Sequence, residues 1–141
     1  MKSQKYQFTQ LENGKQKPKI PVNVINHSTG QKLRVFALLD TGADSCTFPS
    51  MITRTIGYRL DAKSKCEKGT RGISGIEIDT YAHGFRIEVL DQSRKNVIRI
   101  IDLVGHTIEN NDLPPILGTH NFLELFRIDF DYINNEFELK W

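Results

Sequence analysis

The sequence has one carboxylate whose neighbouring residues would suit acid–base chemistry. The apolar run 35–39 ends in Asp40, which is followed by a hydroxyl residue and a glycine, Thr41 and Gly42. A short apolar run bounded by turn residues predicts a buried strand. A lone carboxylate at its end is costly to bury unless it is hydrogen-bonded, paired or functional. Because Gly42 lets the backbone turn tightly behind Asp40, the pattern predicts a carboxylate held at the mouth of a sheet. The alternative is an aspartate that only caps a turn.

The segments that must position this carboxylate have mainly the two-residue period of β-strands. Strands are expected at residues 6–8, 20–25, 33–39, 85–90, 97–104, 126–130 and 137–139. Turns are expected at residues 13–14, 26–30, 91–96 and 134–135. One short C-terminal helix is expected at residues 121–125, because Asn121 and Glu124 have the spacing of a capping box, although Thr119 could cap instead. Many short strands with regularly spaced turns predict a mainly β protein with a small closed or partly closed barrel.

Three segments together resemble the retropepsin-like (retroviral-type) aspartic proteases. Asp40-Thr41-Gly42-Ala43 is similar to the catalytic loop of that family, and Pro115-Ile116-Leu117-Gly118 to its apolar-apolar-Gly segment. Between them, the glycine-rich residues 69–76 are similar to the family's flap. The order of the segments is the family order and spans roughly residues 18–132. The tripeptide Asp-Thr-Gly alone is common, so the resemblance depends on all three segments, and the chain is interpreted as a bacterial member.

The resemblance implies an aspartic endopeptidase with the fold of a small β-barrel. Asp40 would be the catalytic carboxylate, with Thr41 and Gly42 shaping its loop. This chemistry needs two carboxylates that share a proton, and the chain has one Asp-Thr-Gly, so a second copy would supply the other in a homodimer. The reaction would use activated water, with no metal and no cofactor, and the partner would be a peptide or protein substrate.

The resemblance also implies a set of substrate-binding residues. They are Ala43, Asp44, Gly72, Ile73, Ser74, Gly75, Ile116 and Leu117. Each has a simpler alternative. Asp44 could cap a turn, residues 72–75 could form an ordinary glycine-rich surface loop, and Ile116 and Leu117 could belong to the core.

The sequence departs from the family at one place. In many members an arginine follows the apolar-apolar-Gly segment and pairs with the carboxylate at the Asp44 position. Here Thr119 and His120 follow Gly118. A protonated His120 could replace the arginine, but a single histidine is more often a cap or a surface residue.

Composition bounds the remaining possibilities. The 141 residues predict one domain, divided into an N-terminal segment 1–17, either a tail or a dimer strand, and a protease domain 18–141. The net charge is only +2, and the N-terminal lysines are scattered, so neither nucleic acid nor a membrane is expected as a partner. No apolar stretch approaches ~18 residues, and a cytoplasmic protein is the default expectation. The two cysteines, Cys46 and Cys66, do not suggest a disulfide framework or a zinc site.

Two other functions remain open from the sequence. The chain could be a dimeric β-barrel module that binds extended peptides by strand addition without cleaving them. It could also be a structural domain that helps to assemble a larger complex.

Overall fold

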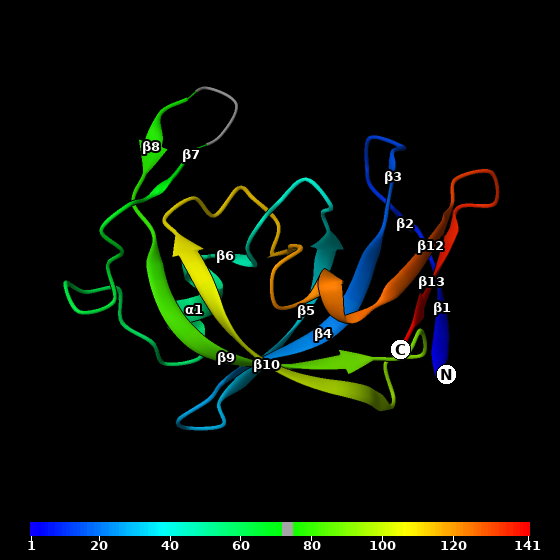
Figure 1. The fold of residues 1–141 in the computed structure, drawn as a ribbon, viewed down its shortest axis with the longest axis horizontal. Coiled ribbons are helices and arrows are strands. Elements are labelled where there is room, and N and C mark those ends of the chain that lie inside the picture. The colour runs from blue at the N-terminus through cyan, green and yellow to red at the C-terminus, as the bar shows by residue number, and fades with distance from the viewer. Residues whose placement is uncertain (72–74) are drawn as a thin grey trace.

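The computed structural model describes residues 1–71 and 75–141 and shows a β-barrel with a small sheet beside it (Figure 1). The barrel strands are β4 (Lys19–Asn26), β5 (Lys32–Leu39), β6 (Thr47–Pro49), β9 (Tyr81–Leu90), β10 (Val97–Ile108) and β11 (Ile116–Leu117). The remaining strands are β1 (Ser3–Gln7), β2 (Thr9–Gln10), β3 (Gln16–Lys17), β7 (Thr70–Arg71), β8 (Glu77–Ile78), β12 (Arg127–Asp131) and β13 (Glu136–Lys140). Gly72, Ile73 and Ser74, which the sequence assigned to a flap, lie outside the described residues.

The six barrel strands are hydrogen-bonded in the order β10–β6–β11–β5–β4–β9 and close between β9 and β10. This confirms the expected mainly β fold with a closed barrel. The core forms because apolar residues alternate along the long strands. Ile20, Val22 and Val24 of β4 are fully buried, and the alternating residues of β9 pack in the same core.

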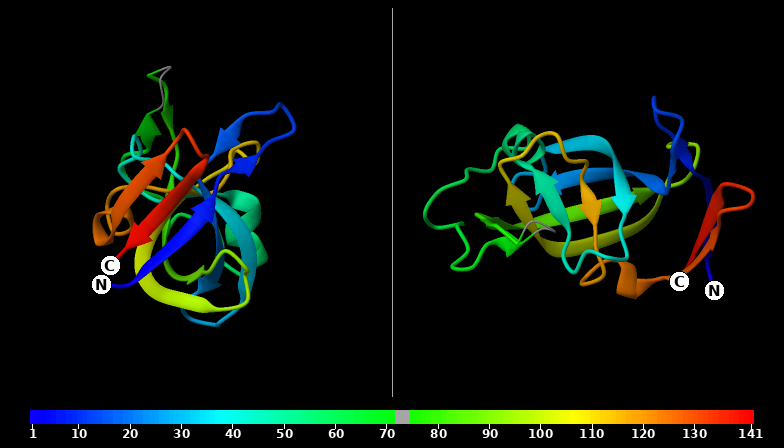
Figure 2. Two further views of the ribbon diagram at one scale, coloured as in Figure 1. Left: turned by 90° about the vertical axis from the view of Figure 1, so that its right-hand side faces the viewer. Right: turned by 90° about the horizontal axis from the view of Figure 1, so that it is seen from above.

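A second sheet, in the order β1–β13–β12, contains both ends of the chain. Its pairing joins Ser3 to Lys140, and Figure 2 shows the two termini side by side. The Tyr6 hydroxyl donates a buried hydrogen bond of 2.7 Å to the Leu90 carbonyl at the end of β9. In the single chain, the N-terminal segment is therefore a strand that pairs with β13 and is tied to the barrel.

The helices are short. The expected C-terminal helix is a 3-10 turn, η1 (Leu123–Leu125), and the Asn121 N–H donates to the Glu124 carboxylate at 2.8 Å, as capping-box spacing suggested. The α-helix α1 (Ser50–Thr55) was not predicted, because six residues are too few to show a helical period. Within the described part of the chain, no helix is both long and apolar enough to span a membrane.

Candidate active site

Asp40 follows the last residue of β5 and begins a tight loop on the open side of the barrel. Its carboxylate accepts a hydrogen bond of 2.9 Å from the Gly42 N–H, and its carbonyl accepts one of 3.2 Å from the Ala43 N–H. Asp40 is half-buried, whereas Thr41 and Gly42 at the tip of the loop are exposed. The loop therefore fixes the position of the carboxylate without sealing it from solvent.

Backbone hydrogen bonds from the segment 115–120 hold this loop on both sides. Before the turn, the Leu38 N–H donates to Pro115 O at 2.9 Å and the Asp40 N–H donates to Leu117 O at 3.1 Å. After the turn, the N–H groups of Thr119 and His120 donate to the carbonyls of Ala43 and Asp44, each at 2.8 Å. The two conspicuous motifs of the sequence thus form one unit, although 71 residues lie between them.

Gly118 is the point where these two segments approach most closely. A Cβ added there would lie 2.4 Å from Ser45 O and 2.7 Å from Ala43 O, distances that real Cβ atoms essentially never show. Since the obstructing atoms belong to the backbone, a side chain at this position would have to displace the Asp40 loop. The glycine is therefore required by close packing of two backbones.

The carboxylate of Asp44 is exposed, and no hydrogen bond or ion pair joins it to another residue in the described ranges. The imidazole of His120 lies 3.5 Å from the Glu124 carboxylate, so its ionic partner is Glu124 and not Asp44. The two segments nevertheless stay together, because the His120 N–H bonds the Asp44 carbonyl. Backbone hydrogen bonds, and not an ion pair to Asp44, therefore join the two segments here.

Strand β11 inserts between β5 and β6 and places its two residues differently. Leu117 is fully buried in the hydrophobic core, and Ile116 is half-buried. Ile116 pairs with Leu38 on one side and with Thr47 on the other. It therefore lies at the rim of the barrel beside the Asp40 loop, whereas Leu117 packs beneath it.

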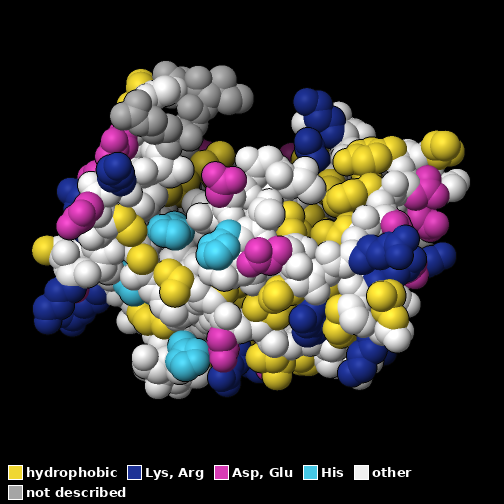
Figure 3. Space-filling view, viewed as in Figure 1, with side chains coloured by type: hydrophobic (Ala, Val, Ile, Leu, Met, Phe, Trp, Pro, Cys, Tyr) yellow, Lys and Arg dark blue, Asp and Glu magenta, His cyan; other side chains and the backbone are white. Residues whose placement is uncertain are grey.

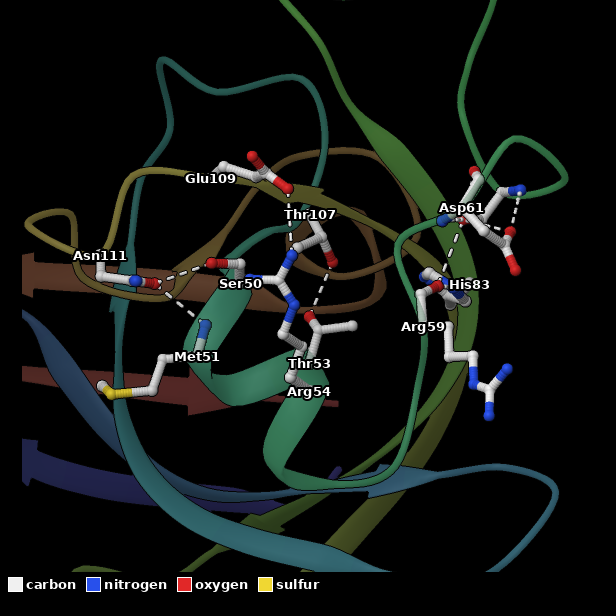
Figure 4. A network of polar contacts seen from close by, with 11 residues as sticks. Ser50, Met51, Thr53, Arg54, Arg59, Asp61, His83, Thr107, Glu109 and Asn111 are labelled. Atoms are coloured by element: carbon white, nitrogen blue, oxygen red, sulfur yellow. Dashed lines mark hydrogen bonds and ion pairs between the residues drawn. The ribbon is translucent and has the colours of Figure 1, made fainter.

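The connection that leads into β11 is anchored to α1 by side chains (Figure 4). Asn111 accepts hydrogen bonds from the Ser50 hydroxyl at 3.1 Å and from the Met51 N–H at 2.9 Å. The buried hydroxyls of Thr53 and Thr107 lie 2.7 Å apart. These contacts fix the end of β10 and the loop after it, and so help to set the position of β11.

A hairpin of β7 and β8 stands on the same side of the barrel as the Asp40 loop (Figure 1). Gly69 enters it so close to its partner strand that an added Cβ would lie 2.0 Å from Ile78 O. Gly75 leads out of the undescribed tip with φ +73°, a conformation that favours glycine. Ile76 and Ile78 are exposed, and Figure 3 shows a recessed surface between this hairpin and the β2–β3 hairpin.

Cys46 is part of the core below the loop and not of its exposed surface. Its side chain is 1% exposed, and burial raises the pKa of the thiol to about 11. A neutral, buried thiol is a poor nucleophile. Cys46 therefore packs as a small apolar residue of the core.

A polar pocket next to this site was not predicted from the sequence. It has a volume of about 150 Å³ and is lined by Ser45, Thr47, Lys68, Gly69, Thr70, Thr80 and His106. These residues are spread over more than 60 positions, and no local motif links Lys68 to His106. The only signal was indirect: Ser45 and Thr47 follow the Asp40 loop, and Gly69 and Thr70 belong to the glycine-rich segment.

Comparison with known proteins identifies the architecture. No protein-family model matches the sequence, and no curated protein matches it significantly. Among solved structures, the chain is similar to a retropepsin-like aspartic protease from Rickettsia conorii, with a TM-score of 0.59 and 15% sequence identity. The match covers 98% of this chain and 91% of the Rickettsia chain. It is also similar to EIAV protease, solved with the inhibitor HBY-793, with a TM-score of 0.50 and 19% sequence identity. That match covers 82% of this chain and 93% of the EIAV protease chain. The closed barrel, the Asp-Thr-Gly loop after β5 and these two likenesses show that the chain has the retropepsin-like fold.

Proposed function

We propose that the protein is an aspartic endopeptidase whose active site forms between two copies of the chain. The observation that carries this proposal is the setting of Asp40. Its carboxylate is fixed by the Gly42 N–H and by the segment 115–120, yet it remains half-exposed in a fold shared with aspartic proteases. A rigid and accessible carboxylate is what general acid–base catalysis requires.

The chemistry needs two such groups in opposite protonation states. Two ionised carboxylates ~4 Å apart repel by ~4 kcal/mol at an effective dielectric constant near 20, so the pair holds one proton. The ionised Asp40 then takes a proton from a water molecule that attacks the peptide carbonyl. The protonated Asp40 of the other chain donates a hydrogen bond to the carbonyl oxygen, which becomes negatively charged in the transition state.

A symmetric homodimer supplies the second carboxylate. The exposed tips of the loops, Thr41 and Gly42, are available to meet across a twofold axis, where the Thr41 hydroxyl would bond the partner loop. The sheet β1–β13–β12 has two open edges, β1 and β12, which can extend the contact by strand pairing. Residues 1–17 would then contribute a strand to the dimer as well as to the single chain.

An extended peptide is the substrate that suits this site. It would lie between the Asp40 loop and the β7–β8 hairpin, with Ile116 beside the scissile bond and Leu117 supporting it from the core. Gly75 and Ile76 of the β7–β8 hairpin would lie over the peptide, and Ile76 would exclude water from it. The carbonyl of Ala43 and the exposed carboxylate of Asp44 would accept hydrogen bonds from the backbone N–H groups of the peptide.

The test is hydrolysis of a peptide library by the wild type and by Asp40→Asn. Asparagine keeps the shape of the side chain but cannot act as a base, so turnover should fall below detection while the circular dichroism spectrum and the dimer are retained. Asp61→Asn is the matched control, since it removes an exposed carboxylate from a distant loop and keeps an oxygen for the Lys63 and Ser64 N–H groups. Undiminished turnover by purified Asp40→Asn would refute the assignment.

The same library distinguishes the non-catalytic alternatives. A peptide-binding module would bind library members with equal affinity in the wild type and the Asp40→Asn variant and cleave none. An assembly domain would neither bind nor cleave the peptides.

A further inference from the structure

The polar pocket beside the Asp40 loop has a lining that differs from the rest of the site. All seven residues are polar or glycine, two of them are basic, and none carries a carboxylate. By contrast, Ile116 on the other side of Thr47 is apolar. The volume of about 150 Å³ is below the range of ~300–1,000 Å³ typical of small-molecule sites, and it suits a single side chain.

The strand register places this pocket within reach of a peptide bound at Asp40. Leu38, Ile116, Thr47 and His106 are successive partners in one row across β5, β11, β6 and β10. Neighbouring strands are ~4.8 Å apart, so His106 lies ~14 Å from Leu38 along the row and Thr47 lies ~10 Å from it. An extended peptide rises ~3.3 Å per residue, so a side chain within about four residues of the cleaved bond can reach the pocket.

The imidazole of His106 brings unused hydrogen-bonding capacity to the pocket. Neither ring nitrogen of His106 bonds another described residue, and its Nδ1 is completely buried. Buried polar atoms without partners are rare and call for a physical explanation. Burial also lowers the pKa of His106, so the ring is a neutral hydrogen-bonding group over more of the acidic range.

Lys68 supplies the positive charge. Its side chain is exposed at the base of the β7–β8 hairpin, and no ion pair joins it to a carboxylate within the described ranges. The carboxylate of Glu77 on β8 accepts a hydrogen bond from the Gly69 N–H at 3.1 Å and does not line the pocket. A cation, hydroxyls and an imidazole around an empty space are complementary to a carboxylate.

We infer that this pocket is a specificity subsite for an acidic side chain, glutamate or aspartate, of the peptide that the site binds. The inference rests on the proposed function for the position of the peptide, but binding can be measured without cleavage. One side of the site would thus select an apolar residue at Ile116, and the other an acidic residue at Lys68 and His106.

The experiment compares end-blocked peptides that differ in a single side chain, which is either glutamate or glutamine. Peptides acetylated and amidated at their ends, so that no terminal carboxylate interferes, carry glutamate or glutamine at each of four positions on either side of the central bond. Fluorescence anisotropy measures their affinity for the Asp40→Asn variant, and kcat/KM is measured with the wild type. At one position glutamate should be preferred about 5- to 10-fold, the effect of one partly exposed ion pair strengthened by charge-assisted hydrogen bonds.

Charge reversal identifies the responsible residue. Lys68→Glu should abolish the preference for glutamate and favour a lysine peptide at the same position. Lys63→Glu, which changes the net charge equally but lies outside the pocket, should leave the preference intact. Equal effects of the two variants, or a glutamate-to-glutamine ratio within twofold at every position, would overturn the inference.

The outcomes separate the two proposals. Cleavage without glutamate preference would leave the proposed function standing and remove the subsite. Lys68-dependent binding of glutamate peptides, without cleavage by the wild type, would support the subsite and refute the proposed function. Peptides neither bound nor cleaved would remove both.

Discussion

Gly118→Ala should damage the protein far more than a single methyl group ordinarily does. The added Cβ would lie 2.4 Å from Ser45 O, and the closest contacts that real Cβ atoms make are about 3.0 Å. The backbone segments must therefore separate by about 0.6 Å. A shift of that size lengthens the 2.8 Å bonds from Thr119 and His120 to about 3.4 Å, beyond the usual range of N–H···O bonds.

The expected cost follows from those two bonds. Each contributes ~0.5–1.5 kcal/mol, so the free energy of unfolding should fall by ~1–3 kcal/mol. With a denaturant slope of ~1–3 kcal/mol/M for urea, the midpoint should fall by about 1 M. Because the Asp40 loop is the part that moves, peptide turnover should fall more steeply, by as much as ~100-fold if the carboxylate shifts by ~1 Å.

The assay is urea unfolding followed by the fluorescence of Trp141, the single tryptophan, which packs edge-on against Phe126. Gly84→Ala is the control, because the nearest atom to its added Cβ, the Cβ of His27, is 4.0 Å away. Its free energy of unfolding should remain within ~0.5 kcal/mol of the wild type. An unchanged midpoint and unchanged turnover for Gly118→Ala would refute the claim that close backbone packing holds the catalytic loop.

Three further outcomes are expected. Specific activity should fall on dilution below the dimer dissociation constant, and a monomer in the ultracentrifuge with full activity would contradict the shared dyad. Hydrolysis should follow a bell-shaped pH profile with an acidic maximum, unaffected by EDTA or by thiol and serine reagents, because one proton is shared by two Asp40 carboxyls. The pKa of Asp91 is lowered to about 2, first by the Asn96 and Ser93 side chains. Its ionised form stabilises the fold above the unfolded pKa of ~3.9, and this is lost as pH falls through about 2. Asp91→Asn should therefore be less stable than wild type at pH 6, with a difference in urea midpoint that shrinks towards pH 2.

The sequence was informative wherever side chains alternate. Ile20, Val22 and Val24 predicted a buried strand because their period matches the pleat, and the structure buries all three. The turn at residues 91–96 was visible because Asp91 and Asn96 are typical turn residues, and their side chains bond each other at 2.8 Å. Strand β6, with three residues, and helix α1, with six, were missed since each is too short to show its period.

The support of the candidate site could not be predicted for a different reason. The Asp40 loop is held by N–H and C=O groups of residues 115–120, and every residue except proline carries both groups. Thr119 and His120 therefore looked like the loss of an ionic contact, whereas their backbones maintain the connection. The polar pocket was hidden because Lys68 and His106 line it from segments that are brought together only in the folded chain.

The pairing of β1 with β13 has a consequence for the order of folding. Strand β1 precedes all the barrel strands in the sequence, but its partner β13 follows all of them. Closing a loop of ~140 residues costs ~4 kcal/mol of chain entropy on the (3/2)RT ln n scaling, whereas the β4–β5 and β9–β10 hairpins close over short connections. The barrel, with the Asp40 loop in it, is thus expected to form first and the terminal sheet last. Hydrogen exchange should find the amides of β1 opening before those of β4. Catalytic competence would then be acquired late in folding, because the surface proposed to join two chains is the last part of this fold to become ordered.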